Sequence, residues 1–200
     1  MKAVVIGASG TIGQAIVEAL GQRHEIITVG SHSGQYQADL KDIAQVRALF
    51  AQIGKVDAVL VAAGILHIGP LDEMTPEQFH IGLNSKLMGQ VNVALVAQHY
   101  LNDGGSITLT SGVDAHQPIR HGANASTSNS AVEGFVRAAA AELKRGLRIN
   151  VVNPTLLTES ASKYGHLFPG FETVPVKRVA LAYMRSAEGI ETGQTYKVWH

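Results

Sequence analysis

Short apolar runs alternate along this chain with stretches of helical spacing. Runs rich in Val and Ile are typical of β-strands, and apolar residues that recur every three or four positions are typical of helices that bury one face. The pattern predicts strands at residues 2–6, 25–29, 56–61, 106–110, 147–152 and 195–198, with a short extended segment at 36–38. It predicts helices at residues 12–20, 43–53, 78–101, 125–145 and 176–187. Residues 156–174 have a mixed composition and look like an insertion.

Strands that alternate with helices are typical of an α/β fold. The run at residues 56–61 is almost continuously apolar, as expected for a parallel strand that is covered on both faces. We therefore predict a Rossmann-like, doubly wound parallel sheet of about seven strands with helices on both faces. Ligands bind at the carboxyl ends of the strands in such a sheet. The strand ends that we expect to converge there are Gly7, Gly64, Ser111 and Asn153.

The composition narrows the classes of partner and chemistry. Sixteen Lys and Arg stand against 16 Asp and Glu without a basic cluster, which argues against nucleic acid or an anionic membrane as a partner. The chain has no cysteine, hence no thiolate chemistry, and its nine histidines show no metal-ligand spacing. No apolar run reaches the ~20 residues of a membrane span, and the first residues form a core strand in place of a leader. We expect one cytoplasmic domain over residues 1–200 that binds a small-molecule substrate, without metal, nucleic acid or membrane.

Three glycines follow the first predicted strand. Gly7, Gly10 and Gly13 stand between a β-branched run and a helix whose apolar face includes Ile12 and Ile16. Glycines at such a turn let the backbone approach a pyrophosphate closely, and the N-terminus of the helix offers unpaired N–H groups to it. The strand, turn and helix together indicate a dinucleotide site, whereas a glycine turn by itself is also compatible with no ligand.

The end of the second predicted strand bears on the choice of cofactor. NAD-binding domains place an acidic residue near this point for the ribose 2′-hydroxyl, and polar or basic residues accommodate the 2′-phosphate of NADP. No Asp or Glu lies between Val29 and Gln37, where Ser31, His32 and Ser33 stand instead. The segment favours NADP over NAD, although these residues are also compatible with an ordinary polar turn.

The order of these landmarks resembles that of the short-chain dehydrogenase/reductase superfamily over nearly the whole chain. Asp39-Leu40 resembles the pair that contacts the adenine, and Ala62-Ala63-Gly64 resembles the family's Asn-Ala-Gly turn with alanine in place of asparagine. Residues 131–134 match an Ala-Val-Glu-Gly motif that the family carries on a helix. Residues 148–154 resemble the segment that leads to the nicotinamide. The resemblance implies a nicotinamide cofactor held by Gly7, Ser9, Gly10, Thr11, Ile12, Gly13, Ser31, His32, Ser33, Asp39, Leu40, Ala62, Ala63, Gly64 and Pro154.

The family's chemistry rests on a Tyr-x-x-x-Lys pair that this chain lacks. In the family the tyrosine moves the hydroxyl proton, while the lysine lowers the pKa of the tyrosine and holds the ribose. Alignment on residues 131–134 puts Ala125 at the tyrosine position and Asn129 at the lysine position, and a shift by one residue puts Asn124 and Ser128 there. An alanine cannot transfer a proton, so the resemblance implies a different proton donor.

Two residues are candidates for this altered catalytic site. Members of the family usually carry an asparagine three residues before a glycine on the long helix, and counting back from Gly89 puts Lys86 there. Lys86 either enters the nicotinamide end of the crevice or lays its stem along apolar surface with the ammonium in water. Ser111 resembles the family serine that binds the substrate carbonyl, and it is also compatible with a serine that closes a turn. His116 and His121, in the loop over the crevice, are further candidates for a general acid.

We expect an NADP(H)-dependent oxidoreductase that transfers a hydride to or from a small carbonyl or alcohol substrate, with Lys86 and Ser111 at the reacting oxygen. The alternative is a nucleotide-binding protein that has lost catalysis and acts as a sensor or interaction partner. The small residues at 138–141 would let another helix approach closely, and members of the family commonly associate through the helices that correspond to residues 78–101 and 125–145. We therefore predict a homodimer or homotetramer formed by these two helices.

Overall fold

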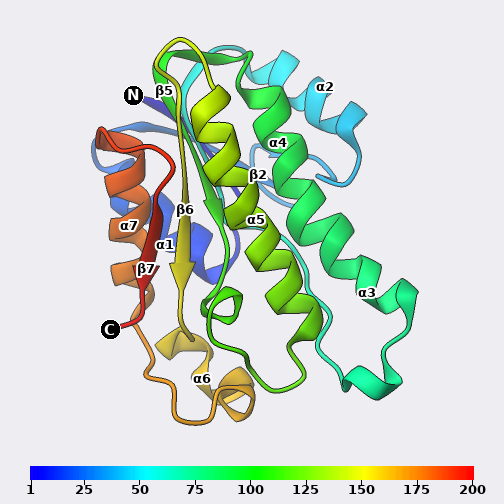
Figure 1. The fold of residues 1–200 in the computed structure, drawn as a ribbon. Coiled ribbons are helices and arrows are strands. Elements are labelled where there is room, and N and C mark those ends of the chain that lie inside the picture. Colours follow the sequence, from blue (N-terminus) through cyan, green and yellow to red (C-terminus); the bar gives the residue numbers. More distant parts are fainter.

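The computed structural model describes residues 1–200, in which a seven-stranded sheet lies between two layers of helices (Figure 1). All neighbouring strands are parallel, in the order β3-β2-β1-β4-β5-β6-β7. The strands are β1 (Lys2–Ile6), β2 (Glu25–Gly30), β3 (Tyr36–Gln37), β4 (Val56–Val61), β5 (Leu101–Thr110), β6 (Arg148–Pro154) and β7 (Thr195–Val198). The helices are α1 (Thr11–Gly21), α2 (Ile43–Ile53), α3 (Pro76–Gly82), α4 (Gly89–Ala97), α5 (Ala123–Glu142), α6 (Ala161–Tyr164) and α7 (Val176–Glu188). The predicted doubly wound parallel sheet is confirmed.

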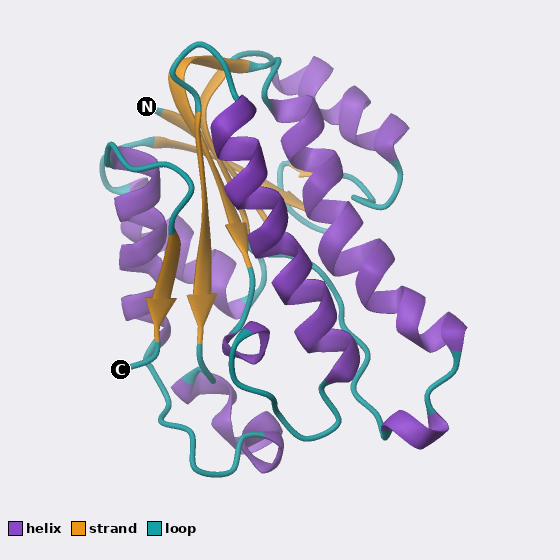
Figure 2. Cartoon of the chain, viewed as in Figure 1, coloured by secondary structure: helices purple, strands orange, loops and turns teal.

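Two apolar cores hold the helices on the two faces of the sheet (Figure 2). Helices α2, α4 and α5 cover one face, through a core that includes Phe50, Val93 and Val136. Helices α1 and α7 cover the other face, where Ile16 and Val179 are fully buried. Strand β1 contributes to both cores because successive side chains of a strand point to opposite faces.

Local signals determine where several helices begin. Helix α3 starts with a capping box in which Thr75 and Gln78 each accept the backbone N–H of the other, and Pro76 occupies the first helical position. Helix α2 starts after Asp42, whose carboxylate accepts a backbone N–H of the first turn. Helix α1 starts after Gly10, which offers no side chain as a cap, so the first N–H groups of α1 are open to a ligand.

The long helix predicted to end at Leu101 is interrupted and ends earlier. Helix α3 passes into a π-helical segment at Leu83–Met88, and α4 ends at Ala97. Leu101 is instead the first residue of β5. The helical spacing of apolar residues continues to this point, but the guanidinium of Arg145 donates to the carbonyl oxygens of Gln98 and Leu101 and holds the chain in a turn between them.

The predicted helix at residues 125–145 is shifted towards its amino end. Helix α5 spans Ala123–Glu142, and Arg145 lies in the following turn with φ +60°. The predicted insertion at residues 156–174 contains α6 and two short 3₁₀ turns, and it lies beside the carboxyl ends of the strands (Figure 1).

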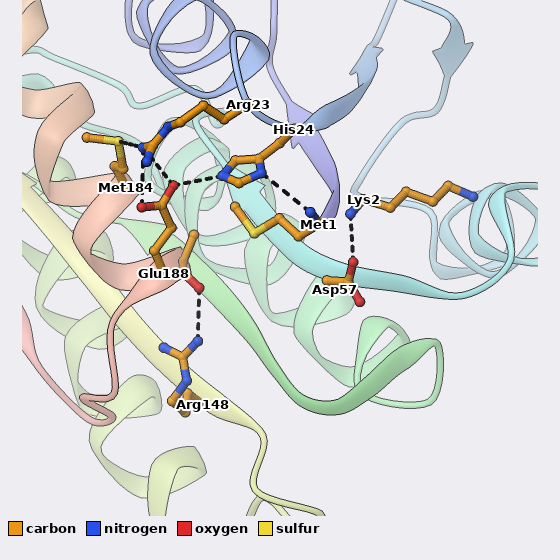
Figure 3. Close-up of polar contacts among 9 residues, drawn as sticks. Met1, Lys2, Arg23, His24, Asp57, Arg148, Met184 and Glu188 are labelled. Carbon is orange, nitrogen blue, oxygen red and sulfur yellow. Dashed lines mark hydrogen bonds and ion pairs between the residues drawn. The ribbon is translucent and has the colours of Figure 1, made fainter.

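Polar contacts link neighbouring elements at the amino ends of the strands, away from the insertion (Figure 3). Glu188, at the end of α7, binds Arg23 at 3.0 Å and His24 at 2.8 Å, both just after α1. Asp57 in β4 accepts the backbone N–H of Lys2 in β1 at 2.6 Å. These contacts join the end of α7 to the loop after α1, and β1 to β4. None of the helices combines the length and apolar character that crossing a membrane requires.

Candidate active site

A groove of about 900 Å³ lies along the carboxyl ends of β1, β2 and β4. The chain order of the strands reverses between β1 and β4, and doubly wound sheets bind ligands at this switch point. Ten of the predicted cofactor residues line the groove, namely Gly7, Ser9, Gly10, Ser31, His32, Asp39, Leu40, Ala62, Ala63 and Gly64. The others do not: Thr11, Ile12, Gly13 and Ser33 lie outside its lining, and Pro154 lines a neighbouring cavity.

The glycine turn at the base of the groove has the shape that an anion requires. Gly7 has φ +84°, and a Cβ there would lie 2.4 Å from the carbonyl oxygen of Ala62. A Cβ at Gly13 would lie 2.0 Å from the carbonyl oxygen of Gly7, so Gly13 serves to pack α1 on the turn, not to line the groove. Gly10 has an open side towards the groove at the uncapped N-terminus of α1. Free N–H groups and the positive end of the helix dipole at this point fit a pyrophosphate.

The far end of the groove carries hydrogen-bonding groups and a positive charge. Ser31, His32 and Ser33 are all exposed, but only Ser31 and His32 line the groove, and Ser33 lies against Gly30. Lys41, which the sequence analysis did not single out, lines the same groove and forms an ion pair with Asp39 at 3.4 Å. This end therefore fits a phosphorylated ribose as well as an unphosphorylated one.

The groove continues into a cavity of about 490 Å³, and Gly64 and Ile65 line both. Most of its wall is apolar and comes from the loops after β4 and β5 and from the segment after β6. These apolar side chains include Leu66, Ile68, Ile119, Leu156, Leu157, Leu167 and Phe168. The predicted insertion therefore forms one wall of this cavity, and Tyr164 adds a hydroxyl to it. A largely apolar cavity with a few polar groups is typical of a site for a small organic molecule.

Lys86 belongs to this cavity. It lies in the π-helical segment between α3 and α4, is 7% exposed and lines the cavity wall. Short π-helical segments often occur at functional sites. Gly64 makes the close approach possible, since a Cβ there would lie 2.8 Å from Cδ of Lys86. Of the two placements that the sequence left open, the structure shows the one inside the crevice.

The electrostatics around Lys86 are those of a buried acid–base pair. No hydrogen bond or ion pair within the protein engages the amine, and burial lowers its pKa from 10.5 to about 8, against the opposing effect of the Asp114 carboxylate. Burial raises the pKa of Asp114, while a hydrogen bond from Asn129 at 2.8 Å and the charge of Lys86 act in the opposite direction. Burial thus pushes the pKa values of the two groups towards neutrality.

Asp114 is the member of the site that the sequence analysis missed. It comes from the 3₁₀ turn Val113–Ala115, which follows β5 after the extended residue Gly112. A Cβ at Gly112 would lie 2.6 Å from the carboxylate of Asp114 and 3.1 Å from the amide nitrogen of Asn129. The signal in the sequence is an acidic residue two positions after a glycine at a strand end. Ala125 and Asn129, at which the sequence resemblance puts the family's tyrosine and lysine, line the same cavity.

Ser111 lines the cavity as well, but its hydroxyl is engaged. It donates to Glu133 in α5 at 2.8 Å, and the same carboxylate accepts Asn153 at 2.6 Å and binds His116 at 2.7 Å. Ser111 can therefore donate to a substrate only after its bond to Glu133 breaks. His116 is held by Glu133, and neither it nor His121 lines the cavity.

Known proteins resemble this chain over most of its length. A family model described as enoyl-(acyl carrier protein) reductase matches residues 7–194. A hydroxynaphthalene reductase of Aspergillus fumigatus is 29% identical over 157 residues, which cover 76% of this chain but only 55% of that longer protein. The protein lin1944 of Listeria innocua, a solved structure, is 44% identical over all of both chains, with a TM-score of 0.98. A small-chain dehydrogenase solved in complex with NADPH is 24% identical, covers 99% of this chain and 96% of its own, and has a TM-score of 0.89, a likeness of fold.

Proposed function

The chain belongs to the short-chain dehydrogenase/reductase superfamily, and from this we propose that it is an NADP(H)-dependent oxidoreductase acting on a small carbonyl or alcohol substrate. One observation carries the proposal. The groove beside the glycine turn continues past Gly64 into a largely apolar cavity where the amine of Lys86 is buried without a partner. The arrangement joins a dinucleotide site to a substrate-sized cavity and puts a proton donor inside it.

The residues of the groove support NADP(H) as the cofactor. The free N–H groups at the start of α1 would hold the pyrophosphate, and Asp39-Leu40 would lie at the adenine. Ser31, His32 and Lys41 would hold the 2′-phosphate through hydrogen bonds and charge. A small-chain dehydrogenase of the same fold is itself bound to NADPH.

Lys86 would supply the charge and the proton that the reaction requires. A bound nicotinamide supplies the hydride, and the protein must stabilise the negative charge that develops on the substrate oxygen. With a pKa of about 8, the amine is mostly protonated at pH 7 and still gives up its proton readily. Asp114, held by Asn129, would return a proton to the amine. Ser111 would donate a hydrogen bond to the same oxygen once its own bond to Glu133 is broken.

A second candidate function rests on the wall of the same cavity. Ala125 and Asn129 line it, and if they stand at the positions of the family's tyrosine and lysine, as the sequence resemblance implies, neither side chain would transfer a proton. General acid–base help contributes roughly 10²–10⁴-fold in rate, so a chain without a replacement donor would turn over very slowly. Such a chain would act as an NADP(H)-binding sensor or interaction protein.

Calorimetric titration with NADPH and with NADH tests the cofactor assignment. We expect NADPH to bind about tenfold more tightly or better, because a charged phosphate contact adds ~1.5–3 kcal/mol. Lys41→Met should weaken the binding of NADPH and leave the affinity for NADH nearly unchanged. A preference for NADH would contradict the assignment of the 2′-phosphate site, and failure to bind either nucleotide would overturn both candidate functions.

A further inference from the structure

Lys86 differs from every other lysine of the chain in its surroundings. It is the only lysine that is buried, and it lines a cavity whose wall is mostly apolar. Other lysines engage their amine outside this cavity: Lys2 with the carbonyl oxygen of Ile53, Lys55 with that of His99, and Lys41 with Asp39. Lys86 therefore lies in a cavity wall, and its amine has no partner within the protein.

We propose that Lys86 is a covalent site for small apolar aldehydes, which its amine binds reversibly as an imine. This activity requires no nicotinamide cofactor, so it goes beyond the proposed hydride transfer although it uses the same cavity. The ligand class follows from the wall of the cavity, which offers apolar contacts to a short alkyl chain and no second cation to hold a carboxylate or phosphate.

An amine adds to a carbonyl only in its neutral form, with a free lone pair. Burial in an apolar pocket is one of the two ways in which proteins produce such a lysine. At pH 7.5 an amine with a pKa of about 8 is neutral in about a quarter of the molecules, whereas an ordinary exposed lysine is neutral in about one in a thousand. The amine also has no hydrogen bond to break before it reacts.

Imine formation needs proton transfers, and Asp114 is the acid that shares the cavity with Lys86. The lone pair of Nζ first forms a bond to the carbonyl carbon, and the carbonyl oxygen takes a proton, which gives a carbinolamine. The C–O bond then breaks, the oxygen leaves as water with a second proton, and the C=N bond forms. The two protons that the oxygen gains are those that the nitrogen loses, so no oxidant or reductant is involved.

The surroundings of Asp114 suit it to this exchange. Its carboxylate accepts one hydrogen bond, from Asn129, while burial and the nearby charge of Glu133 favour the protonated form. The carboxyl group can therefore donate a proton to the departing oxygen and take one from the nitrogen. The released water has an exit, because the cavity joins the cofactor groove at Gly64 and Ile65.

Reductive trapping tests this proposal on the full chain without any nicotinamide nucleotide. The protein is mixed with 2-methylpropanal and sodium cyanoborohydride at pH 7.5, and peptide mass spectrometry follows the initial rate of N-alkylation at each lysine. Lys177, exposed on α7 and outside the cavity, is the internal control in the same molecule. We expect Lys86 to be alkylated about tenfold faster than Lys177, although Lys177 is far more accessible.

Two variants locate the chemistry. Asp114→Asn should slow alkylation of Lys86 about tenfold without changing Lys177, since the amide cannot relay a proton. Lys86→Met should abolish the fast phase for the whole protein. Alkylation of Lys86 at or below the rate of Lys177 in the wild type would overturn the proposal. Because no nucleotide is present, that result would not contradict the proposed reduction. In the same way, a failure to bind NADPH would not contradict the proposed imine.

Discussion

At the scale of the residue, Lys86 carries the chemistry that we propose for the cavity. Its side chain is buried, which disfavours the charged form of the amine, and no hydrogen bond within the protein offsets this effect. Strongly shifted pKa values in a cleft are a mark of functional sites. Burial shifts the pKa values of Lys86 and Asp114 towards each other within one cavity, which brings both groups nearer to the range that suits acid–base catalysts.

Lys86 makes the stability of the protein depend on pH in a definite direction. The amine has a pKa of about 8 in the folded protein and near 10.5 in the unfolded chain, so between these values the unfolded chain binds a proton that the folded protein does not. The free energy of unfolding should therefore rise with pH over this range, by at most ~1.4 kcal/mol per pH unit from this residue.

Urea unfolding at pH 8 and pH 9.5 measures this rise. Lys86→Met should remove most of it, and Lys177→Met should keep it. Identical pH dependence in the wild type and in Lys86→Met would contradict the burial of the amine.

At the scale of the element, the strand, turn and helix at the amino end were predictable because each part leaves a local signal. The β-branched run, the spacing of Gly7, Gly10 and Gly13 and the helical pattern that follows all point to one unit. The separate tasks of these glycines were not predictable, since they depend on neighbours. Gly7 avoids the carbonyl oxygen of Ala62 in β4, and Gly13 avoids the turn itself.

The π-helical segment and Asp114 show why the rest of the site could not be predicted from the sequence. Apolar residues keep α-helical spacing through Leu83–Met88, so the wider turn leaves no periodic signal. Its position depends on Gly64 and on Gly82, where a Cβ would lie 2.2 Å from the side chain of Asn124 in α5. Asp114 lies in a turn whose conformation no periodicity encodes, and its partner Asn129 comes from the next helix.

Two glycines with similar backbone conformation allow the glycine turn to be tested. Gly7→Ala and Gly104→Ala both place an alanine at positive φ, which costs about 1–2 kcal/mol. A Cβ at Gly104 meets nothing within 4 Å, whereas at Gly7 it would press on the backbone of Ala62. We expect Gly7→Ala to lose a further ~1–3 kcal/mol in urea unfolding and to lose NADPH binding. Equal losses of stability in the two variants would show that β4 does not constrain this turn.

At the scale of the whole molecule, the outer face of α3 and α4 leaves apolar side chains uncovered. Ile81, Met88 and Leu95 are 40%, 41% and 44% exposed and stand seven residues apart. Ala138 and Ala141 on the neighbouring α5 are exposed too and leave room for another helix. Large apolar surface that a monomer leaves in water marks interaction sites. These observations support the prediction of a homodimer or homotetramer formed through these helices, with the first of them ending at Ala97.

Light scattering coupled to size exclusion measures the assembly. We expect at least a dimer at micromolar concentration, and a shift towards monomer in Leu95→Arg because a charge would be buried against the second copy. Leu181→Arg, on the exposed side of α7 at the other face of the sheet, is the matched control and should keep the wild-type mass. A monomeric wild type would contradict the predicted assembly.

The role of Lys86 in reduction is tested most directly by kcat/KM for small aldehydes and ketones with NADPH, measured through the loss of absorbance of the reduced nicotinamide. The compound that the wild type reduces best is then used for Lys86→Met and for Lys177→Met, with NADPH binding to each variant checked by calorimetry. We predict that Lys86→Met binds NADPH but loses about 10²–10⁴-fold in kcat/KM, as expected when a proton donor is removed, while Lys177→Met matches the wild type. Wild-type kcat/KM in Lys86→Met, or no reduction of any compound by a wild type that binds NADPH, would contradict the role of Lys86 as the proton donor of a reductase.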